Sequence, residues 1–590
     1  MTCRIHGFRG WLALPCLLLQ AVGAEWRGWW VDAFHPGIKS PTEVAQLVSH
    51  ARAAHINALF VQVRKRGDAY YDSALEPKAP EISPPSFDPL AELLRLAHDT
   101  SGGQPRLDVH AWIVAYNIWN SASRQPSQPN HPYRLHPDWL TESVGGNRWD
   151  GSNYAFDPAH PQVQDHTVAV ALDLVTRYDV DGLHLDYIRY NGSSWGYHPV
   201  AVRRFQRQYG RTTRPAATDA QWSQFRRDQV TALVRRIHLS AVRMKPQLRI
   251  SAATITFAPG ITATSQWTTS AAYREVFQDW RAWLEEGLLD LNAPMAYFRQ
   301  GANGADWTAW STFAKNHRYG RHLALGVATY LNTPTDSVRQ LRSTRLPTES
   351  GGTADGMALY SYASPASDGT TFDPFREGLR SGFPGDTEPP LFEAPDRVPP
   401  MPWKDQPVEG ALLGGLRGAD GARVVLSGPG VRMLRADANG WFGALRVPPG
   451  EVRLTAEALG AVWMGTVRIE AGRVAEPTLW RVDGDDDGDG VTNEEELLWG
   501  TDPGAVEGEE AILIEPMLGG LQMRFPGGPA GREFVVWYRR DLGVESDWEE
   551  IFRTVTSADE APPVVDLSPW WAPVSGGFYR VEIRWAAGGE

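Results

Sequence analysis

The sequence predicts a (β/α)8 barrel, the TIM-barrel form of the α/β class, followed by small all-β domains. Short apolar segments alternate with helical patterns from residue 25 to residue 385. A proline-rich connector covers residues 386–407, and short alternating runs separated by turn residues follow it. Since a chain of 590 residues is long enough for several domains, we expect the barrel to be one of them.

Eight strand candidates recur along the barrel region. They lie at residues 29–33, 58–63, 107–114, 182–186, 249–256, 289–297, 323–330 and 357–362. Helical patterns lie between them, for example at residues 41–55, 88–99, 161–178 and 275–286. This alternation predicts a closed parallel barrel. A doubly wound open sheet would need a glycine-rich turn after the first strand, and residues 30–34 contain no glycine.

The N-terminus has the features of a signal peptide. Arg4 and Arg9 precede an apolar stretch at residues 11–22, and the small residues before Glu25 suit cleavage after Ala24. The alternative is an uncleaved anchor, but the stretch is shorter than the ~20 apolar residues of a membrane span. No later stretch is long and apolar enough. We therefore expect a secreted, periplasmic or cell-envelope protein that is not an integral membrane protein.

The composition excludes several classes of function. Cys3 and Cys16 both lie in the signal peptide, so the mature chain has no disulfide and no thiol chemistry. Cleavage takes the net charge from −13 to −15, because Arg4 and Arg9 are removed. This disfavours nucleic acid and anionic membranes as partners. The 25 tryptophans fit either a carbohydrate-binding surface or a tryptophan-rich core.

Three further segments follow the barrel. The connector at 386–407 predicts a stiff, extended linker. Residues 408–480 predict a small β-sandwich with turns at 436–442 and 447–450. This segment resembles carboxypeptidase regulatory-like modules of secreted proteins in its Asp437-x-x-Gly440-x-Phe442 turn and later Pro449-Gly450. Residues 506–590 are β-rich, with their clearest strands at 534–538 and 578–583, and we expect an accessory or cell-surface attachment role.

The segment 481–505 carries a candidate calcium loop. Ca²⁺ requires six or more oxygen ligands around a sharply turned loop. The spacing predicts the ligands Asp485, Asp487, Asp489, the Val491 carbonyl, Asn493 through water and Glu496, with Gly490 at the turn. The loop resembles those of dockerin and thrombospondin type 3 repeats, but only one is present, whereas a dockerin has two. A solvated acidic linker is the alternative. We expect a structural Ca²⁺ ion and no cofactor for catalysis.

The clearest site in the barrel lies on its fourth strand, residues 182–186. Strand alternation directs Leu183 and Leu185 outward, and Gly182, His184 and Asp186 into the barrel. Asp186 ends the strand, at the C-terminal rim where barrel enzymes carry their active sites. It is either a catalytic carboxylate or the ion-pair partner of a residue such as Arg64.

Other rim residues are candidates for substrate binding, and each is equally compatible with a place in the core. Arg64 follows the second strand, and His184 lies one layer below the rim. The full set comprises Arg64, Asp68, Trp112, Asn117, His184, Tyr187, Met295 and Tyr297.

The barrel resembles the bacterial glycosyl-hydrolase-like 10 family over most of residues 26–335. The resemblance rests on motifs at residues 27–31, 62–64, 67–71, 109–112, 157–158, 178–187 and 294–297. It implies a barrel fold and glycoside hydrolase activity. One member cuts peptidoglycan glycan strands stripped of peptides, so this polymer is the leading substrate. Many members have paired acids after the fourth strand, whereas here Tyr187 takes the second place.

Glycoside hydrolysis usually requires two carboxylates, so a partner for Asp186 is expected. Asp279 and then Glu275 are the first candidates, because they lie near the start of a helix that faces the rim. Asp279 as a solvent-facing helix-start residue is the alternative. Asp32 and Asp68, after the first and second strands, also qualify. The sequence therefore predicts an exported glycoside hydrolase, with a non-catalytic glycan-binding barrel as the competing interpretation.

Overall fold

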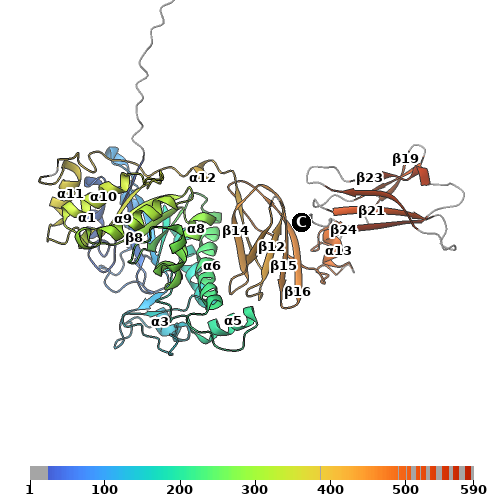
Figure 1. Cartoon of the computed structure of the whole chain (residues 1–590), viewed down its shortest axis with the longest axis horizontal. Coiled ribbons are helices and arrows are strands. Elements are labelled where there is room, and N and C mark those ends of the chain that lie inside the picture. Colours follow the sequence, from blue (N-terminus) through green and yellow to red (C-terminus); the bar gives the residue numbers. More distant parts are fainter. Residues whose placement is uncertain are drawn as a thin grey trace, which may run out of the picture.

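The computed structural model describes residues 24–585 except 386, 429, 489–490, 500, 506–512, 518–519, 526–531, 540–547, 557–562 and 571–577. Nearly all of the expected signal peptide, and the expected ligand Asp489, therefore lie outside the described residues. The barrel, a pair of small β-sheets and a last β-rich part follow one another in chain order (Figure 1).

Eight parallel strands close into a barrel, as predicted. Going around it, their order follows the chain, and the last strand pairs with the first. The strands are β1 (Trp26–Val31), β2 (Ala58–Arg64), β3 (Asp108–Val114), β6 (Gly182–Asp186), β7 (Arg249–Ile255), β8 (Leu291–Ala296), β9 (His322–Ala328) and β10 (Gly356–Tyr360).

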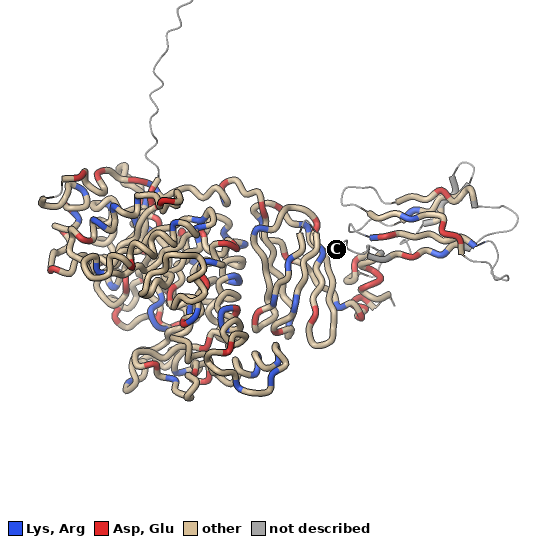
Figure 2. Tube along the Cα trace, in the orientation of Figure 1, with Lys and Arg blue, Asp and Glu red and all other residues tan. Residues whose placement is uncertain are grey.

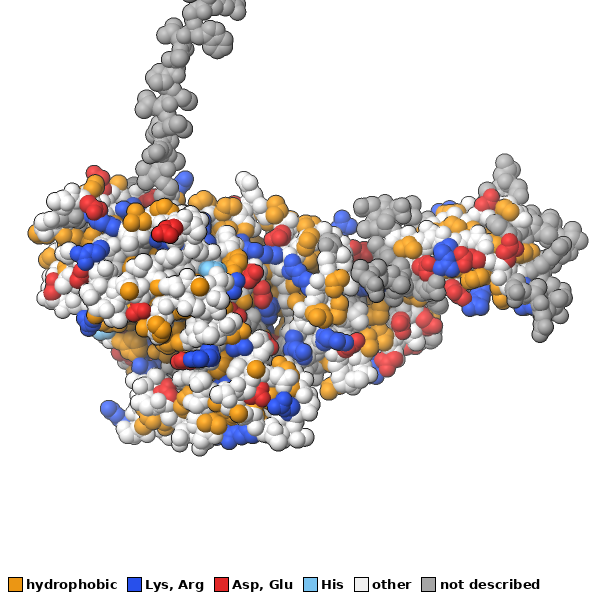
Figure 3. All heavy atoms as spheres, viewed as in Figure 1, with side chains coloured by type: hydrophobic (Ala, Val, Ile, Leu, Met, Phe, Trp, Pro, Cys, Tyr) orange, Lys and Arg blue, Asp and Glu red, His pale blue; other side chains and the backbone are white. Residues whose placement is uncertain are grey.

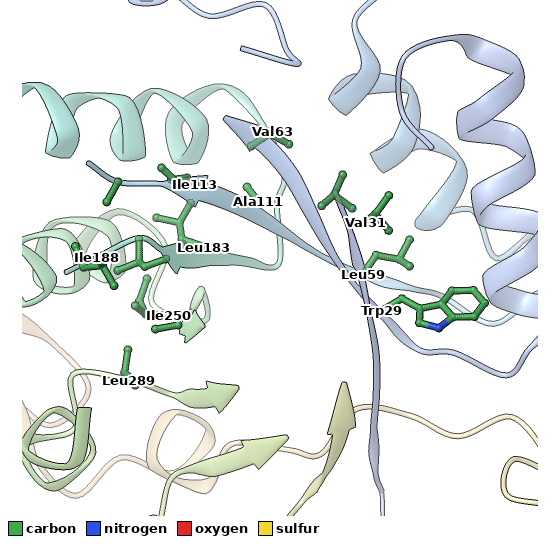
Figure 4. Close-up of a cluster of buried hydrophobic side chains, with 14 of the residues drawn as sticks. Trp29, Val31, Leu59, Val63, Ala111, Ile113, Leu183, Ile188, Ile250 and Leu289 are labelled. Carbon is green, nitrogen blue, oxygen red and sulfur yellow. The ribbon is translucent and has the colours of Figure 1, made fainter. Parts of the chain in front are cut away.

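Helices surround the strands and cover their outward side chains. Leu183, Ile113 and Leu59 belong to this outer core, and Figure 4 shows such side chains projecting from neighbouring strands. The helices are α1 (Pro41–Ala53), α2 (Pro89–Ala97), α4 (Pro161–Arg177), α5 (Pro199–Tyr209), α6 (Ala220–Met244), α7 (Ala271–Arg274), α8 (Trp280–Glu286), α9 (Gln300–Asn316), α10 (Pro334–Arg345) and α11 (Phe372–Ser381). Within the described residues, none of the helices has the length and apolar character required to cross a membrane.

The helix expected at residues 275–286 begins later than predicted. Helix α7 ends at Arg274 and α8 starts at Trp280. Between them Phe277 has φ +57°, and the side-chain oxygen of Gln278 accepts a hydrogen bond from Ile255 N at 2.7 Å. This buried bond to the β7 backbone fixes the intervening segment in a non-helical path.

The long segment between β3 and α4 forms a small subdomain beside the rim. It contains β4 (Asn117–Trp119), β5 (Tyr154–Ala155) and the short helix α3 (Pro132–Leu135). Strands β4 and β5 pair antiparallel, which brings Asn117 opposite Ala155.

Two sheets pack face to face after the barrel, around Leu412, Val424, Phe442 and Leu454. One sheet has the order β14-β11-β17 and the other β13-β12-β15-β16-β18. Their strands are β11 (Gly410–Gly415), β12 (Arg423–Ser427), β13 (Arg432–Arg435), β14 (Trp441–Val447), β15 (Gly450–Ala458), β16 (Ala461–Ile469), β17 (Val474–Ala475) and β18 (Trp480–Arg481).

This β-sandwich is fixed to the side of the barrel. The Arg204 guanidinium forms a two-pronged ion pair with Asp420 at 2.6 and 2.9 Å, and Leu239 of α6 packs against Leu413. Figure 3 shows basic and acidic side chains where the barrel meets the sandwich. Because these contacts are buried or part-buried, the two parts form a continuous body.

Helix α13 (Asn493–Trp499) and two three-stranded sheets follow. The sheet orders are β19-β20-β23 and β22-β21-β24. The strands are β19 (Leu513–Met517), β20 (Gly520–Arg524), β21 (Arg532–Arg539), β22 (Glu549–Val555), β23 (Val564–Asp566) and β24 (Phe578–Trp585).

The proline-rich connector is not a free spacer, in contrast to the stiff, extended linker expected from its composition. Phe392 is fully buried in the outer core of the barrel, and the carbonyl of Ala394 accepts a hydrogen bond from Arg27 at 2.6 Å. The short helix α12 (Pro402–Asp405) then lies against the N-terminal end of the barrel. Burial of apolar side chains next to the prolines explains why the connector packs.

Asp290 at the base of β8 anchors this connector. Its carboxylate accepts a hydrogen bond from Trp403 Nε1 at 2.8 Å and pairs with Lys404 Nζ at 2.8 Å. Burial opposes ionisation of Asp290, but the Lys404 ammonium holds its pKa below the ordinary value. The side chains are 1% and 9% exposed, so this is a buried ion pair.

Replacing Lys404 by Met should destabilise the protein by about 3–5 kcal/mol, because Asp290 would remain buried without its counter-charge. Lys245→Met is the matched control. Lys245 pairs at 3.6 Å with Asp179, whose side chain is 86% exposed, and donates to the Tyr178 carbonyl at 2.7 Å, so its loss should cost about 1 kcal/mol. Urea unfolding at pH 7 measures both. Equal losses in the two variants would contradict a structural role for the connector.

Candidate active site

A pocket of about 230 Å³ opens at the C-terminal ends of the barrel strands. Aromatic side chains from six strands or their following loops form much of its wall. They are Trp30, Phe34, Trp112, Tyr187, Tyr297, Tyr330 and Tyr360. Flat aromatic faces next to a few polar groups suit a ligand with both apolar and hydroxylated surfaces.

Asp186 lies in this pocket at the end of β6. Its Oδ2 accepts a hydrogen bond from Trp112 Nε1 at 3.1 Å. Its Oδ1 accepts one from Tyr187 N at 2.6 Å and pairs with Arg189 at 3.3 Å. Three donors, one of them a guanidinium, hold this side chain in one orientation.

The chain turns sharply directly after Asp186. Tyr187 has φ +47°, in the left-handed region that residues other than glycine seldom adopt. The Arg189 guanidinium lies 4.1 Å from the centre of the Tyr187 ring. This turn places the ring at the pocket wall and returns Arg189 to Asp186. Such local strain is common at functional sites.

Two stacked tyrosines lie near Asp186 and a second carboxylate, Asp32. The rings of Tyr297 and Tyr360 are 5.2 Å apart at 26°. Burial raises the pKa of both hydroxyls, and the charges of Asp186 and Asp32 raise both further. Asp186 and Asp32 therefore lie close enough to the same tyrosine pair to affect both rings.

Asp32 follows β1 and is 2% exposed. Its Oδ1 accepts hydrogen bonds from Phe34 N at 2.9 Å and His35 N at 3.1 Å, which fixes the loop that carries Phe34. Its Oδ2 is buried and makes no hydrogen bond within the described part of the chain. A buried carboxylate oxygen without a partner is costly, so it is available to a bound ligand.

Comparison with known proteins supports a glycosidase-like identity for this barrel. The family model for "Glycosyl hydrolase-like 10" matches residues 26–334. The chain belongs to this family.

Two curated relatives share its sequence at a moderate level. Glycosyl hydrolase YngK of Bacillus subtilis (strain 168) is 26% identical over 399 residues, which cover 62% of this chain and 69% of the relative. Glycosyl hydrolase DigH of Escherichia coli (strain K12) is 26% identical over 341 residues, covering 51% and 70%. The PgaB (BpsB) glycoside hydrolase domain from Bordetella bronchiseptica is 14% identical, with coverage of 61% and 99% and a TM-score of 0.43, too distant to bear on function.

Six of the residues proposed from the sequence line the pocket of this glycosyl hydrolase-like 10 barrel. They are Trp112, Asn117, Asp186, Tyr187, Met295 and Tyr297. Sequence reasoning did not propose Trp30, Arg66, Arg189 or Tyr360 as site residues. Strand alternation places Trp26 and Trp30 inside the barrel, and extending it by two residues directs inward Asp32, which the sequence already offered as a second acid after the first strand.

Arg64 and Asp68 do not line the pocket. The Arg64 guanidinium pairs with Glu76 at 2.6 and 2.7 Å and donates to the Val114 and Ala115 carbonyls. Asp68 is buried and accepts a hydrogen bond from Arg66 N at 2.9 Å, and burial raises its pKa. Arg64 does not form the alternative ion pair with Asp186, because its guanidinium is used by Glu76 and by the Val114 and Ala115 carbonyls.

Asp279 and Glu275 are not in the pocket either. Asp279 is the N-cap of α8, where its Oδ1 accepts hydrogen bonds from Ala282 N and from Trp267 Nε1 at 3.0 Å. It lines a separate hollow between the barrel and the sandwich. Glu275 has a half-exposed side chain near Arg274. Residues 275–279 therefore do not bring a carboxylate to Asp186, because the Asp279 carboxylate caps helix α8.

His184 lies below the pocket in a buried network. Trp30 Nε1 donates to its Nε2 at 2.9 Å, so the proton is on Nδ1, which donates to Ser251 Oγ at 2.9 Å. His110 contacts the same hydroxyl at 3.2 Å. Burial lowers the pKa of His184 well below its ordinary value and that of His110 to about 3. Both rings are therefore neutral supports of the pocket floor, and His184 does not line the pocket.

The stability of the protein should decrease as pH falls from about 6.5 to 5. The unfolded chain binds protons on His110 and His184 near the ordinary value of about 6.5, whereas the folded chain does not. Each histidine then contributes up to about 1.4 kcal/mol of loss per pH unit. His110→Asn should reduce this slope. Urea unfolding at pH 7, 6 and 5 compares the two proteins, and identical slopes would rule out His110 as a cause of the pH dependence.

Proposed function

We propose that the protein is a glycoside hydrolase that cleaves the O-glycosidic bonds of a polysaccharide. The observation that carries the proposal is Asp186, held at the C-terminal rim by Trp112, Tyr187 and Arg189 inside an aromatic pocket. A carboxylate so held can act as the nucleophile or as the general base of glycoside hydrolysis. Membership of a glycosyl hydrolase-like family supports the same assignment.

Asp32 is our candidate for the second carboxyl group. Its Oδ2 is buried and makes no hydrogen bond within the described residues, and it affects the same two tyrosines as Asp186. Asp32 would serve as the proton donor to the leaving oxygen. Backbone N–H groups hold Oδ1, so Oδ2 is the oxygen that would contact the substrate.

Peptidoglycan glycan strands are our candidate substrate. The family resemblance includes a member that cuts peptide-free strands, and the expected signal peptide would export this chain to the envelope. The last β-sheets would attach the protein there. Together these points support the proposal. The substrate can be tested on purified protein, and export and attachment can be tested on cell fractions.

Asp186→Asn and Asp32→Asn should each lower kcat/KM on the glycan at least about 100-fold, since positioned acid–base groups contribute roughly 10²–10⁴-fold. Asp279→Asn is the matched control, because Asn also caps helices well and Asp279 lies outside the pocket. Release of reducing ends measures activity, and circular dichroism checks folding. Full activity of Asp186→Asn would overturn the proposal, while loss of activity in Asp279→Asn would reinstate it as a site residue.

A binding-only function has one observation in its favour. Asp186 is the single carboxylate among the described residues that line the pocket. If wild-type protein binds glycan but releases no product on long incubation, and Asp186→Asn still binds it, the barrel is a glycan-binding protein.

We also propose that the loop from Asp485 to Glu496 binds a structural Ca²⁺. Its spacing of acidic residues supports this, and acidic residues gather at the start of α13 (Figure 2). The Asn493 amide bonds to Asp486 at 3.0 and 3.1 Å and to the Arg481 carbonyl, and these bonds hold the loop around this predicted ligand together. No three Asp, Glu or His side chains gather as a metal site in the described residues, which omit Asp489.

Chelation should speed proteolysis of this junction at least several-fold, because unneutralised carboxylates repel one another in a short loop. Glu496→Gln should make the protein equally sensitive without chelator. Glu494→Gln is the control, since Glu494 is exposed and lies outside the ligand spacing. If calorimetry detects no Ca²⁺ binding and cleavage is equally fast with and without chelator, the loop is an acidic spacer.

A further inference from the structure

Three cationic side chains, Lys65, Arg66 and Arg189, line the pocket around Asp186. Two of them are already neutralised. The Lys65 ammonium contacts the Glu81 carboxylate and the Tyr70 hydroxyl, and Arg189 pairs with Asp186 at 3.3 Å. These two cations therefore hold the pocket together and have little charge left for a ligand.

Arg66 differs from both. Its guanidinium lies 4.6 Å from the centre of the Phe34 ring, and Phe34 is 48% exposed at the mouth of the pocket. Within the described residues it makes neither a hydrogen bond nor an ion pair through its guanidinium. Burial lowers the pKa of Arg66, and the acidic groups nearest to it only partly offset this effect. Arg66 is thus a partly desolvated cation whose guanidinium has no direct carboxylate partner in the described part of the chain, although the Asp68 and Glu81 charges act on it.

The backbone around Arg66 is held in one conformation, which fixes where the Arg66 side chain begins. Arg66 N donates to Asp68 Oδ1 at 2.9 Å, and Gly67 has φ +76°. A Cβ at Gly67 would approach Ile118 to 2.6 Å, so only glycine fits this turn. The aromatic contact with Phe34 then holds the planar guanidinium at the mouth.

We propose that Arg66, stacked on Phe34, forms an anion-binding subsite that receives the carboxylate of an acidic sugar unit of the glycan. This rests on the proposed function and names the substrate class. A planar guanidinium matches a carboxylate through two parallel hydrogen bonds. The negative charge of Asp186 would repel a second carboxylate deep in the pocket, so the acidic group binds at the mouth, beside Phe34.

The test uses one glycan in two forms. Peptide-free peptidoglycan strands carry a lactyl carboxylate, and carbodiimide activation followed by borohydride reduces this group to an alcohol without changing the backbone. Wild-type protein should cleave the native strands with a kcat/KM at least about tenfold above that for the reduced strands. Arg66→Gln should lose this preference to within about twofold while keeping activity on the reduced strands.

Two further variants sharpen the comparison. Arg66→Lys keeps the charge but loses the two-pronged geometry, so its preference should be intermediate. Arg214→Gln is the matched control, because Arg214 also stacks on an aromatic ring, Tyr197 at 4.8 Å, but does not line the pocket. It should behave as wild type.

An oligouronate and a chitin oligosaccharide extend the test to other glycans. If the protein prefers the oligouronate to the neutral chitin chain, the subsite accepts any sugar carboxylate.

Equal cleavage of native and reduced strands by wild-type protein would overturn the subsite. So would an Arg66→Gln defect of the same size on both forms, which would mean that Arg66 only holds Phe34 in place. If wild-type protein cleaves none of the glycans, the hydrolase proposal fails, and calorimetric affinities for the same two strand forms test the subsite on their own.

Discussion

Closure of the barrel by pairing β10 with β1 is the constraint on which the site depends. Trp26 pairs with Gly356 and Trp30 with Tyr360, which joins segments more than 300 residues apart. A Cβ at Gly356 would lie 2.1 Å from the Trp26 carbonyl oxygen, so glycine is required for this close approach. Once the ring is closed, the ends of all eight strands meet at one rim. Trp30 on β1, Asp186 on β6 and Tyr360 on β10 reach a common pocket only because of this closure.

The interior of the barrel is filled by aromatic and neutral polar groups, which also form the floor of the site. Trp30 donates to His184, and Trp112 donates to Asp186. The many tryptophans were compatible with either a sugar-binding surface or a tryptophan-rich core. Trp30 and Trp112 both pack in the core and line the pocket. Their indole N–H groups find acceptors, which removes the cost of burying them.

Periodicity predicted the barrel strands closely, because alternation and apolar runs are local properties of the chain. The same local rule directed Asp186 inward at the rim. Residues that depend on distant partners could not be assigned this way. Arg64 is taken by Glu76 and His184 by Trp30 and Ser251, and nothing in the sequence around each residue specifies these partners. Asp279 fits a helix cap as well as a catalytic position, and the choice is made by Trp267 and Ala282 N. The packing of the connector likewise depends on Asp290, more than 100 residues before Trp403.

The charged groups of the barrel fall into two kinds: those that are paired within the fold, and those near the pocket that lack a partner among the described residues. Buried charges need partners, and most in this barrel have them: Arg64 with Glu76, Lys404 with Asp290 and Arg204 with Asp420. Each such pair is satisfied within the fold and holds two segments together. In the described part of the chain, Arg66 and the Asp32 Oδ2 are two of the groups that depart from this rule; Arg66 lines the pocket, and Asp32 lies two residues before the wall residue Phe34. Incomplete pairing is unfavourable for folding alone, since a partly desolvated charge or a buried oxygen loses water without gaining a bond. A bound glycan would supply both missing partners at once, an acidic group for Arg66 and a hydroxyl or glycosidic oxygen for Asp32. Under the proposed function, these two unsatisfied groups are therefore where we expect the substrate to bind.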